Sequence, residues 1–97
     1  MVKGGCIYII TNSRHTTLYT GVTSNLSKRI HQHRNEFYPN SFSARYNLYK
    51  LVYYEVFSRI EDAIAREKQI KAGSRKKKEE LINSINPVWK DLIDEFV

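Results

Sequence analysis

The sequence predicts a small α/β domain of the α+β type: a three-stranded antiparallel sheet flanked by helices, in the order β-β-α-β-α-α-α. Two short strand-like runs precede the first helical pattern, and a third run separates that pattern from the later helices. The chain has 97 residues, of which 41% are hydrophobic and 12% aromatic, which suits one compact core rather than two. We therefore expect residues 1–97 to form a single domain.

The first two strands are expected to form a hairpin. The segment from Gly5 to Thr11 is rich in β-branched and aromatic residues, and the polar cluster from Asn12 to His15 follows it as a turn. The segment from Thr16 to Thr20 is typical of a second strand. Gly21 closes the pair, and its missing Cβ allows another backbone or a ligand to approach closely.

The hydrophobic period changes to that of a helix after Asn25, which can cap this helix, as can Ser24. The residues at i, i+4, i+7 and i+11 share one face: Leu26, Ile30, His33 and Phe37. Pro39 and Asn40 interrupt the pattern, and Ser41 to Asn47 is polar. We therefore expect a surface loop after the helix.

The segment from Leu48 to Phe57 predicts a third, longer strand, expected at the centre of the sheet. Ser58 and Glu61 have the spacing of a capping box, in which each side chain binds the other residue's backbone N–H. A helix should therefore begin there, run to Ala72 and end at Gly73.

Two further helices are expected in the C-terminal part of the chain. Ser74 can cap a helix that continues through Asn83. Asn86 followed by Pro87 predicts the start of the last helix, because Asn caps well and Pro suits the first helical turn.

Charge and cysteine content restrict the function. Sixteen Lys and Arg against ten Asp and Glu give a net charge of +6, which attracts polyanions. Nucleic acid, acidic proteins and anionic lipid all remain open on this ground. The single cysteine, Cys6, can build neither a disulfide framework nor a thiolate zinc site, which is compatible with a reducing cytoplasm.

The apolar run from Cys6 to Ile10 is too short for a signal-peptide core or a membrane span. We therefore expect a cytoplasmic protein with no membrane anchor. The sequence also lacks a Walker loop, zinc-ligand spacing, a Ser/His/Asp signature and a Gly-rich dinucleotide fingerprint.

Glu67 departs most from its local pattern. In a helical projection it falls on the apolar stripe of Ile60, Ala63 and Ile64. A carboxylate in such a place needs a hydrogen-bonded partner, an opposite charge or a cation. A salt bridge to a neighbouring Arg or Lys would satisfy this need, and so would a metal ion at the edge of a cleft.

Two residues of the first expected helix also face the sheet side. His33 lies in the apolar stripe, and Arg29 lies at its edge one turn away. A core histidine with satisfied nitrogens and a plain surface arginine are the simplest interpretations of these positions.

A basic run marks the start of the helix after Ser74. It comprises Lys71, Arg75, Lys76, Lys77 and Lys78. Helix N-termini disfavour cations, and a start with four of them becomes favourable when an anion such as phosphate lies nearby. A solvated basic face is the alternative.

The triplet Cys6-Ile7-Tyr8, followed eleven positions later by Tyr19-Thr20-Gly21, resembles the paired motif of the GIY-YIG nucleases. The resemblance extends over almost the whole chain, through Gly21-Val22-Thr23, Asn25-Leu26, Arg29-Ile30, His33, the run from Arg66 to Lys71, and the run from Asn86 to Trp89. The chain is similar to the small stand-alone bacterial members of this family, which are related to the N-terminal nuclease domain of the excision-repair endonuclease.

The resemblance implies a three-stranded antiparallel sheet with the motif tyrosines on adjacent strands, and metal-assisted hydrolysis of a phosphodiester with Mg²⁺ or Mn²⁺. It implies that Tyr8 and Tyr19 position or deprotonate the attacking water. Arg29 would bind the scissile phosphate, and Glu67 would hold one divalent cation. A carboxylate with waters suits Mg²⁺, which keeps much of its hydration shell.

Other positions match the family less completely. His33 matches a position that assists the tyrosine or the phosphate. Asn86 matches an asparagine near the end of the family domain, although helix capping explains it equally well. Cys6 replaces the first family glycine, and Val22 replaces a lysine found in some members, which removes one possible phosphate ligand.

We therefore expect a metal-dependent endonuclease that hydrolyses phosphodiester bonds of nucleic acid, DNA rather than RNA, with a role in DNA repair. So short a chain has little surface for reading bases, which favours recognition of nucleic-acid structure. One alternative is a catalytically weak nucleic-acid-binding module with the same fold. An adaptor for an acidic protein is another.

Overall fold

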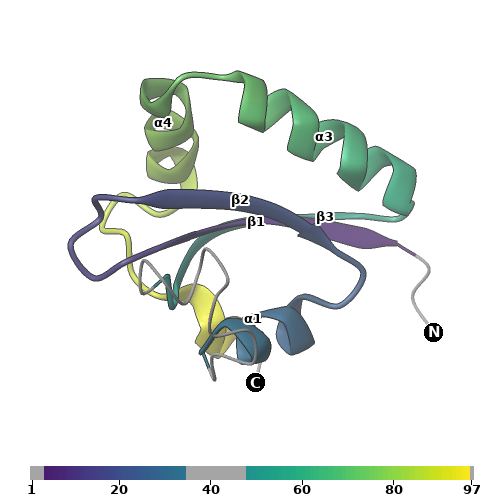
Figure 1. Ribbon diagram of the computed structural model, residues 1–97, viewed down its shortest axis with the longest axis horizontal. Helices are drawn as coiled ribbons and strands as arrows, with labels where there is room; N and C mark the ends of the chain where they lie inside the picture. The colour runs from purple at the N-terminus through teal and green to yellow at the C-terminus, as the bar shows by residue number, and fades with distance from the viewer. Residues whose placement is uncertain (1–3, 35–47, 97) are drawn as a thin grey trace.

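A computed structural model describes residues 4–34 and 48–96 (Figure 1). The elements are β1 (Gly5–Thr11), β2 (Leu18–Thr23), α1 (Leu26–Arg34), β3 (Lys50–Phe57), α3 (Ile60–Ala72), α4 (Arg75–Ile85) and the 3-10 helix η1 (Leu92–Phe96). The expected α+β class and element order are confirmed. The expected loop from Ser41 to Asn47, and Phe37, Pro39 and Asn40 before it, lie outside the described residues.

The three strands form one antiparallel sheet in the order β2-β1-β3. The central strand is therefore β1, and the expectation that the third strand is central was wrong. Strand β1 is a nearly continuous apolar run that is buried on both faces, which is the pattern of a central strand. Strand β3 is longer but lies at an edge, where Val56 is 64% exposed. Length does not determine the place of a strand in a sheet.

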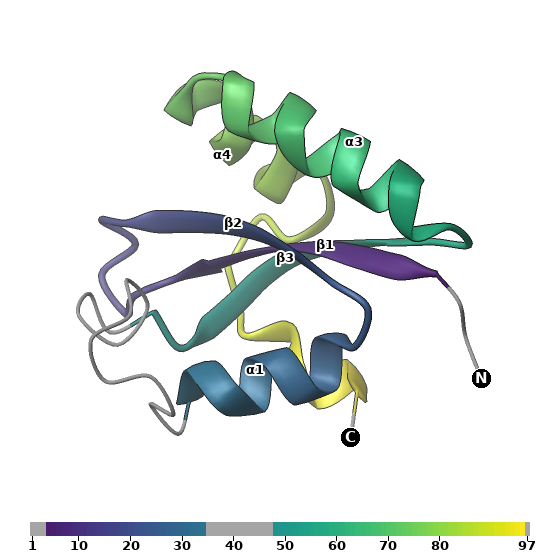
Figure 2. The same cartoon turned by 45° about the vertical axis from the view of Figure 1, so that its right-hand side comes forward.

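Helices cover both faces of the sheet. Helices α3 and α4 lie on one face, whereas α1 and η1 lie on the other (Figures 1 and 2). Successive strand residues point to opposite faces, so two cores form. The α3 side buries Ile7, Ile9, Val52, Tyr53, Ala63, Ile70 and Ile82. The α1 side buries Tyr8, Ile10, Leu26, Ile30, Leu48, Leu51 and Leu92.

Two of the four expected helix caps are present. The Asn25 side-chain oxygen accepts a hydrogen bond from the Lys28 backbone N–H at 3.1 Å, and Ser74 Oγ accepts one from the Lys77 backbone N–H at 3.2 Å. The capping box at the start of α3 was wrong. This helix begins one residue later, with Arg59 at the N-cap and no side-chain cap, and Glu61 pairs with Arg59 instead.

No helix begins at Asn86, contrary to the sequence expectation. Helix α4 continues to Ile85, and a turn follows it. The buried Asn86 amide donates to the Val52 carbonyl at 3.0 Å and to the Lys90 carbonyl at 2.9 Å, while its oxygen accepts from the Lys90 N–H at 3.1 Å. Asn86 thus ties this turn to β3, and these bonds replace the expected capping role.

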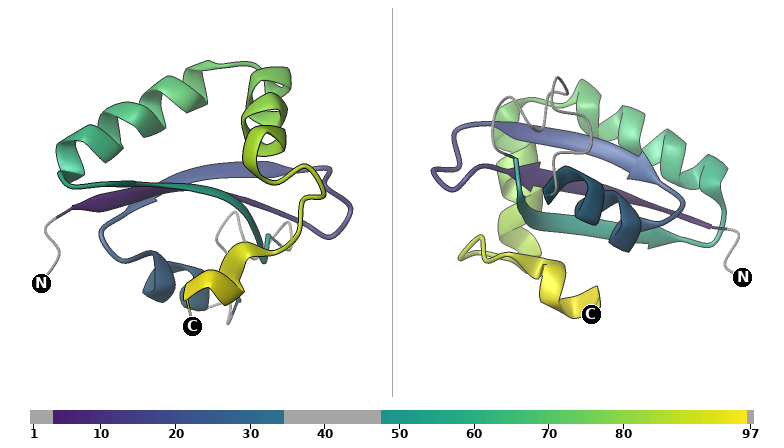
Figure 3. Two further views of the ribbon diagram at one scale, coloured as in Figure 1. Left: turned by 180° about the vertical axis from the view of Figure 1, so that it is seen from behind. Right: turned by 60° about the horizontal axis from the view of Figure 1, so that its bottom comes forward.

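Helix α1 runs across the sheet face opposite α3 (Figure 3). A short connection at one end of the sheet joins β2 to α1. The backbone of His33 lies in α1 as expected, whereas its side chain is outside the described part of the structure. Within residues 4–34 and 48–96, no helix combines the length and hydropathy needed to cross a membrane.

Candidate active site

The two motif tyrosines lie side by side on neighbouring strands. Tyr8 of β1 and Tyr19 of β2 face the α1 side of the sheet, and their ring centroids are 6.3 Å apart with an interplanar angle of 43°. Gly21 lies directly opposite Tyr8 in the strand register. A Cβ on Gly21 would collide with the Tyr8 hydroxyl and ring. The close approach expected at Gly21 is therefore made by the Tyr8 side chain, which fixes the hydroxyl beside β2.

Three other residues predicted for the site, Tyr19, Arg29 and Glu67, act electrostatically on the Tyr8 hydroxyl. Tyr8 is 2% exposed, and its burial raises the pKa of the phenol well above its usual range. Tyr19 and Glu67 raise this pKa further, whereas the positive charge of Arg29 lowers it. Tyr8 is therefore a neutral phenol at neutral pH.

Glu67 forms an ion pair within α3. Its carboxylate lies 3.0 Å from the Lys71 ammonium, one turn further along the helix. Ala63 and Ile70, on either side of Glu67 along the same stripe, are buried, and the Glu67 side chain is only 14% exposed. Its need for a partner is confirmed, and it lies on the buried face of the helix, although Ile64 of the expected stripe is 38% exposed and Ile70 is buried instead.

Lys71 connects this pair to the tyrosines. Its ammonium lies 5.9 Å from the centroid of the Tyr19 ring, within the range of a cation–π contact. Because α3 and Tyr19 are on opposite faces of the sheet, the Lys71 side chain reaches round the outer edge of β2. Glu67 and Lys71 therefore complete a cluster that combines a carboxylate, two phenols and a cation at this edge.

The donor set of the cluster fits a weakly held, hydrated cation. No group of three or more His, Cys, Asp or Glu side chains gathers anywhere in the described part of the chain, which argues against a zinc-type site within it. Mg²⁺ needs only one or two carboxylates, because waters and substrate phosphates supply its other ligands. Glu67 meets that requirement.

Arg29 projects from α1 between the tyrosine cluster and a neighbouring pocket. Its charge acts on Tyr8, and its side chain also lines a pocket of about 330 Å³ at the end of β2. Lys28, the preceding residue, lines the same pocket. This arrangement can place an anion between the tyrosines and the start of α1.

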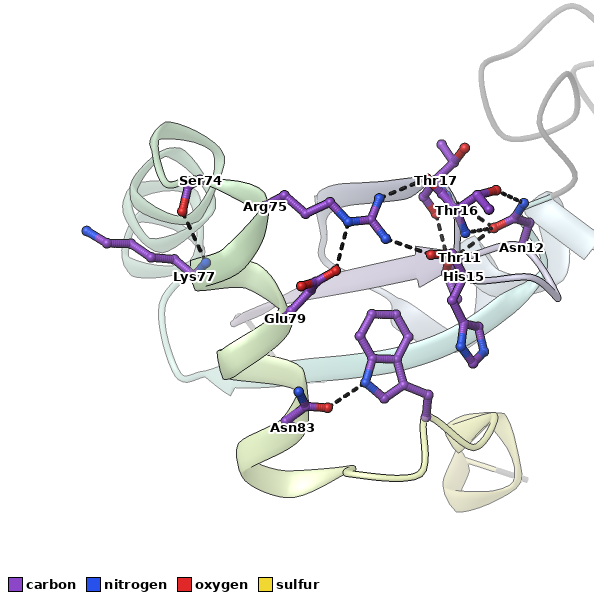
Figure 4. Close-up of polar contacts among 11 residues, drawn as sticks. Thr11, Asn12, His15, Thr16, Thr17, Ser74, Arg75, Lys77, Glu79 and Asn83 are labelled. Atoms are coloured by element: carbon purple, nitrogen blue, oxygen red, sulfur yellow. Dashed lines mark hydrogen bonds and ion pairs between the residues drawn. The ribbon is translucent and has the colours of Figure 1, made fainter.

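The expected nucleic-acid-binding run does not form one free surface. The Arg75 guanidinium donates to the Thr16 carbonyl at 2.8 Å and to the His15 carbonyl at 2.6 Å, and it pairs with Glu79 at 2.9 Å (Figure 4). Arg75 thus fastens α4 to the β1–β2 turn. The Lys78 ammonium donates to the Gly73 carbonyl at 3.3 Å.

The remaining predicted contacts divide between two places. Lys76 and Lys77 are exposed on α4. Lys77 and Lys78 line a second cavity, of about 390 Å³, between α3 and α4. Asn86 is buried behind α4 and is occupied by the hydrogen bonds described above.

Two cations were not assigned to the site from the sequence: Lys71, beside Tyr19, and Lys28, in the pocket with Arg29. Lys71 was assigned only to the basic run, although its i,i+4 spacing from Glu67 is a recognisable ion-pair signal. Lys28 was not singled out, and only the turn from β2 into α1 brings it to the Arg29 pocket.

Comparison with known proteins gives consistent matches. The model of the family described as the GIY-YIG catalytic domain matches residues 4–80. A UPF0213 protein from Syntrophus aciditrophicus is 37% identical over 81 residues, which covers 84% of this chain and 91% of the relative. A UPF0213 protein from Clostridium perfringens is 39% identical over 82 residues, covering 80% and 82%.

The fold also matches a solved structure. The solution NMR structure of a UPF0213 protein from Bacillus halodurans superposes with a TM-score of 0.58 at 25% sequence identity. The match covers 91% of this chain and 92% of that one. The architecture described above is therefore shared over nearly the full length of both chains.

Proposed function

Because the chain belongs to the GIY-YIG catalytic-domain family, which implies nuclease-type activity, we propose that it is a metal-dependent endonuclease. Its substrate would be the phosphodiester backbone of nucleic acid, DNA rather than RNA, recognised by structure. The observation that carries the proposal is the pair of motif tyrosines, Tyr8 and Tyr19, side by side on neighbouring strands. The charges of Arg29 and Glu67 lie near enough to act on the buried Tyr8 hydroxyl.

Each residue has a separate task in this proposal. Arg29 binds the scissile phosphate and neutralises the charge that develops on it. Glu67 holds Mg²⁺ or Mn²⁺, which would supply Lewis-acid stabilisation of the same phosphate. His33 assists the phosphate or a tyrosine. Water adds across one P–O bond, so the products are a phosphate monoester and a free hydroxyl.

The tyrosines handle the attacking water. A neutral Tyr8 can donate a hydrogen bond to an oxygen of the substrate or the water, but it cannot accept the water proton. It becomes a base only after a nearby cation has lowered its pKa. We propose that Tyr19, whose ring lies beside that of Tyr8, acts on the same water. The Lys71 ammonium, which pairs with one oxygen of Glu67, opposes the binding of a second cation by that carboxylate.

The substrate is expected to extend beyond the reacting phosphate. We propose that the positive charges of Lys76, Lys77 and Lys78 attract the flanking phosphates. Arg75 and Asn86 contribute by holding α4 and the turn after it against the sheet. Removing the three lysine charges should reduce the salt dependence of duplex binding, by about 0.9 in log–log slope for each phosphate that is no longer neutralised.

The decisive experiment is a cleavage survey. Flaps, forks, nicked duplexes and single strands are incubated with Mg²⁺ or Mn²⁺ and, in parallel, with chelator. We expect cleavage only with metal, and a loss of about 100-fold or more when either Tyr8→Phe or Tyr19→Phe removes a hydroxyl. Tyr53→Phe removes a hydroxyl on the opposite sheet face and serves as the matched control.

The outcomes separate the two main hypotheses. If both tyrosine variants cut at the wild-type rate, the proposed mechanism is wrong. If the protein binds these substrates and cuts none of them with any metal, it is a binding module. The Val22 position, which lacks the lysine of some family members, is the sequence feature that favours this second function.

A further inference from the structure

Strand β2 ends where the chain turns into α1 (Figure 2). A polar pocket lies at this turn. Its volume is about 330 Å³, and it is lined by Thr23, Ser24, Asn25, Lys28, Arg29 and Gln32. All six residues are polar or charged. Two of them are cations and none of the six is a carboxylate, so the pocket suits an anion.

Hydrogen bonds hold the wall of this pocket in shape. The Thr23 hydroxyl accepts from the Asn25 N–H at 3.1 Å and donates to the Asn25 carbonyl at 3.2 Å. The Asn25 side chain in turn accepts from the Lys28 N–H at 3.1 Å. These bonds are made within the wall and do not use the Lys28 ammonium, which can point at a ligand. A preformed wall reduces the entropy lost on binding.

One residue, Arg29, relates the pocket to the tyrosine cluster. Arg29 lines the pocket and is also the cation whose charge acts on Tyr8. An anion in the pocket and an anion beside Tyr8 would therefore both be attracted by the same guanidinium. Successive phosphates of one nucleic-acid strand present such neighbouring charges.

We propose that this pocket binds the phosphate next to the scissile phosphate on the same strand, with Lys28 as its cation and Gln32 as a hydrogen-bond donor. The inference rests on the proposed nuclease function. Lys28 and Gln32 are one helical turn apart and share a face of α1. Lysine is a common point-charge ligand of phosphate. The strand thus passes from the β2 edge across Arg29 and along the start of α1.

The cavity between α3 and α4 is a weaker candidate for this role. It also carries three cations, Arg66, Lys77 and Lys78. However, Arg66 is paired with Glu55 at 3.1 Å, and Lys78 donates to a carbonyl just before its own helix. The residues that line this cavity all lie outside the tyrosine cluster.

The first test measures binding without catalysis. Binding of a labelled duplex is followed in chelator at several salt concentrations for the wild type, Lys28→Gln and Lys90→Gln. Lys90 is an exposed lysine next to Trp89, whose ring stacks on His15 at the β1–β2 turn. We expect the log–log slope to fall by about 0.9 for Lys28→Gln and to stay unchanged for Lys90→Gln. Equal slopes for the two variants would overturn the proposal.

The second test locates the phosphate. A neutral methylphosphonate is placed at the linkage adjacent to the cleaved bond. It should weaken binding by the wild type about tenfold and leave binding by Lys28→Gln unchanged, because that variant has no ammonium at this position to pair with the phosphate charge. If Lys28→Gln remains as sensitive as the wild type, the subsite is not there.

The source of the phosphate is tested by competition. Inorganic phosphate at the concentration of the bound oligonucleotide should not displace it, because a free ion lacks the second contact at Arg29. Equal competition would make the pocket a free-anion site and overturn the strand proposal. Because binding is measured in chelator, failure of cleavage and failure of this subsite are distinguishable.

Discussion

Two ion pairs with the same sequence spacing have different roles in this molecule. In α3, Glu67 and Lys71 lie 3.0 Å apart, and in α4, Arg75 and Glu79 lie 2.9 Å apart. Each joins residues i and i+4. Glu67 is 14% exposed and Glu79 is 41% exposed, so the two carboxylates differ more in burial than in geometry.

The different roles of the two pairs follow from the other contacts of their cations. Arg75 donates its other hydrogen bonds to the His15 and Thr16 carbonyls, so its guanidinium stabilises the fold (Figure 4). Lys71 lies over Tyr19 instead. The role of each cation therefore depends on the partners of its remaining N–H donors. Net charge and sequence spacing do not predict those partners.

The largest expected effect is on cleavage by Glu67→Gln, which removes the carboxylate whose charge acts on Tyr8. Cleavage should vanish, while binding persists through Arg29 and the lysines. Lys71 is half exposed, so removal of the pair should cost less than about 1 kcal/mol of unfolding free energy. Cleavage assays and urea denaturation of the same preparation measure both quantities.

Glu79→Gln is the matched control, because it neutralises the carboxylate of the other i,i+4 pair. It should leave cleavage at the wild-type level. The contrast would collapse if Glu67→Gln cleaved normally in Mg²⁺. It would also collapse if that variant melted much earlier while Mg²⁺ never raised the wild-type melting temperature, since Glu67 would then be a structural residue.

Arg75→Gln should show the opposite pattern. It removes charged hydrogen bonds to two carbonyls and one ion pair, all at partly exposed positions, so we expect a decrease on the order of 1–2 kcal/mol in unfolding free energy. Cleavage per folded molecule should not change. Chemical denaturation measures the first quantity, with the exposed neighbour Lys76→Gln as control. A stable but inactive Arg75→Gln would place Arg75 among the substrate-binding residues instead.

Much of the fold could be predicted because local patterns determined it. The bounds of β1, the end of α3 at Gly73 and the Ser74 cap follow from short-range chemistry. The order of the strands could not be predicted from such local patterns, because it depends on which strands pair with each edge of β1. The role of Asn86 was wrongly predicted for a similar reason: its partner Val52 lies 34 residues away.

The site was predictable only where residue type and family resemblance agreed. Tyr8, Tyr19, Arg29 and Glu67 were chosen on those grounds. In the structure Tyr19 lies beside Tyr8 and the charges of Arg29 and Glu67 act on Tyr8, while the catalytic roles of all four stay predictions. Arg75 looked equivalent to its lysine neighbours in sequence, yet the turn that it holds is visible only in three dimensions. Lys28 illustrates the converse, because its pocket exists only after β2 turns into α1.

Lys71→Gln should tighten metal binding. The Lys71 ammonium pairs with Glu67 Oε2, so its positive charge competes with a divalent cation for the same carboxylate. Removing a half-exposed pair of this kind should lower the Mn²⁺ or Mg²⁺ dissociation constant by about two- to fivefold. Thermal stabilisation by metal measures this constant without substrate. Lys68→Gln, which removes an exposed charge from the same helix, is the control, and equal affinities in the two variants would contradict this competition.

The smallest expected effect is a change in the alkaline titration of Tyr8. Burial is the main reason that its pKa is raised, and Glu67 is the weakest of the raising influences. A tyrosine whose folded pKa exceeds its unfolded value of about 10 contributes stability that is fully present below that pH. This contribution disappears as the pH rises through the folded pKa.

Tyr8→Phe should therefore lose less unfolding free energy than the wild type when the pH is raised above about 10. Glu67→Gln should shift the onset of Tyr8 ionisation slightly downward, because one negative charge near the phenolate has gone, and Glu79→Gln should not shift it. Phenolate absorbance, followed in parallel with urea unfolding at each pH, measures both effects. If the wild type and Tyr8→Phe lost stability at the same rate, the Tyr8 hydroxyl would not be in a desolvated site. If Glu67→Gln and Glu79→Gln titrated alike, the two ion pairs would be electrostatically equivalent, and the distinction between them would rest on Arg75 alone.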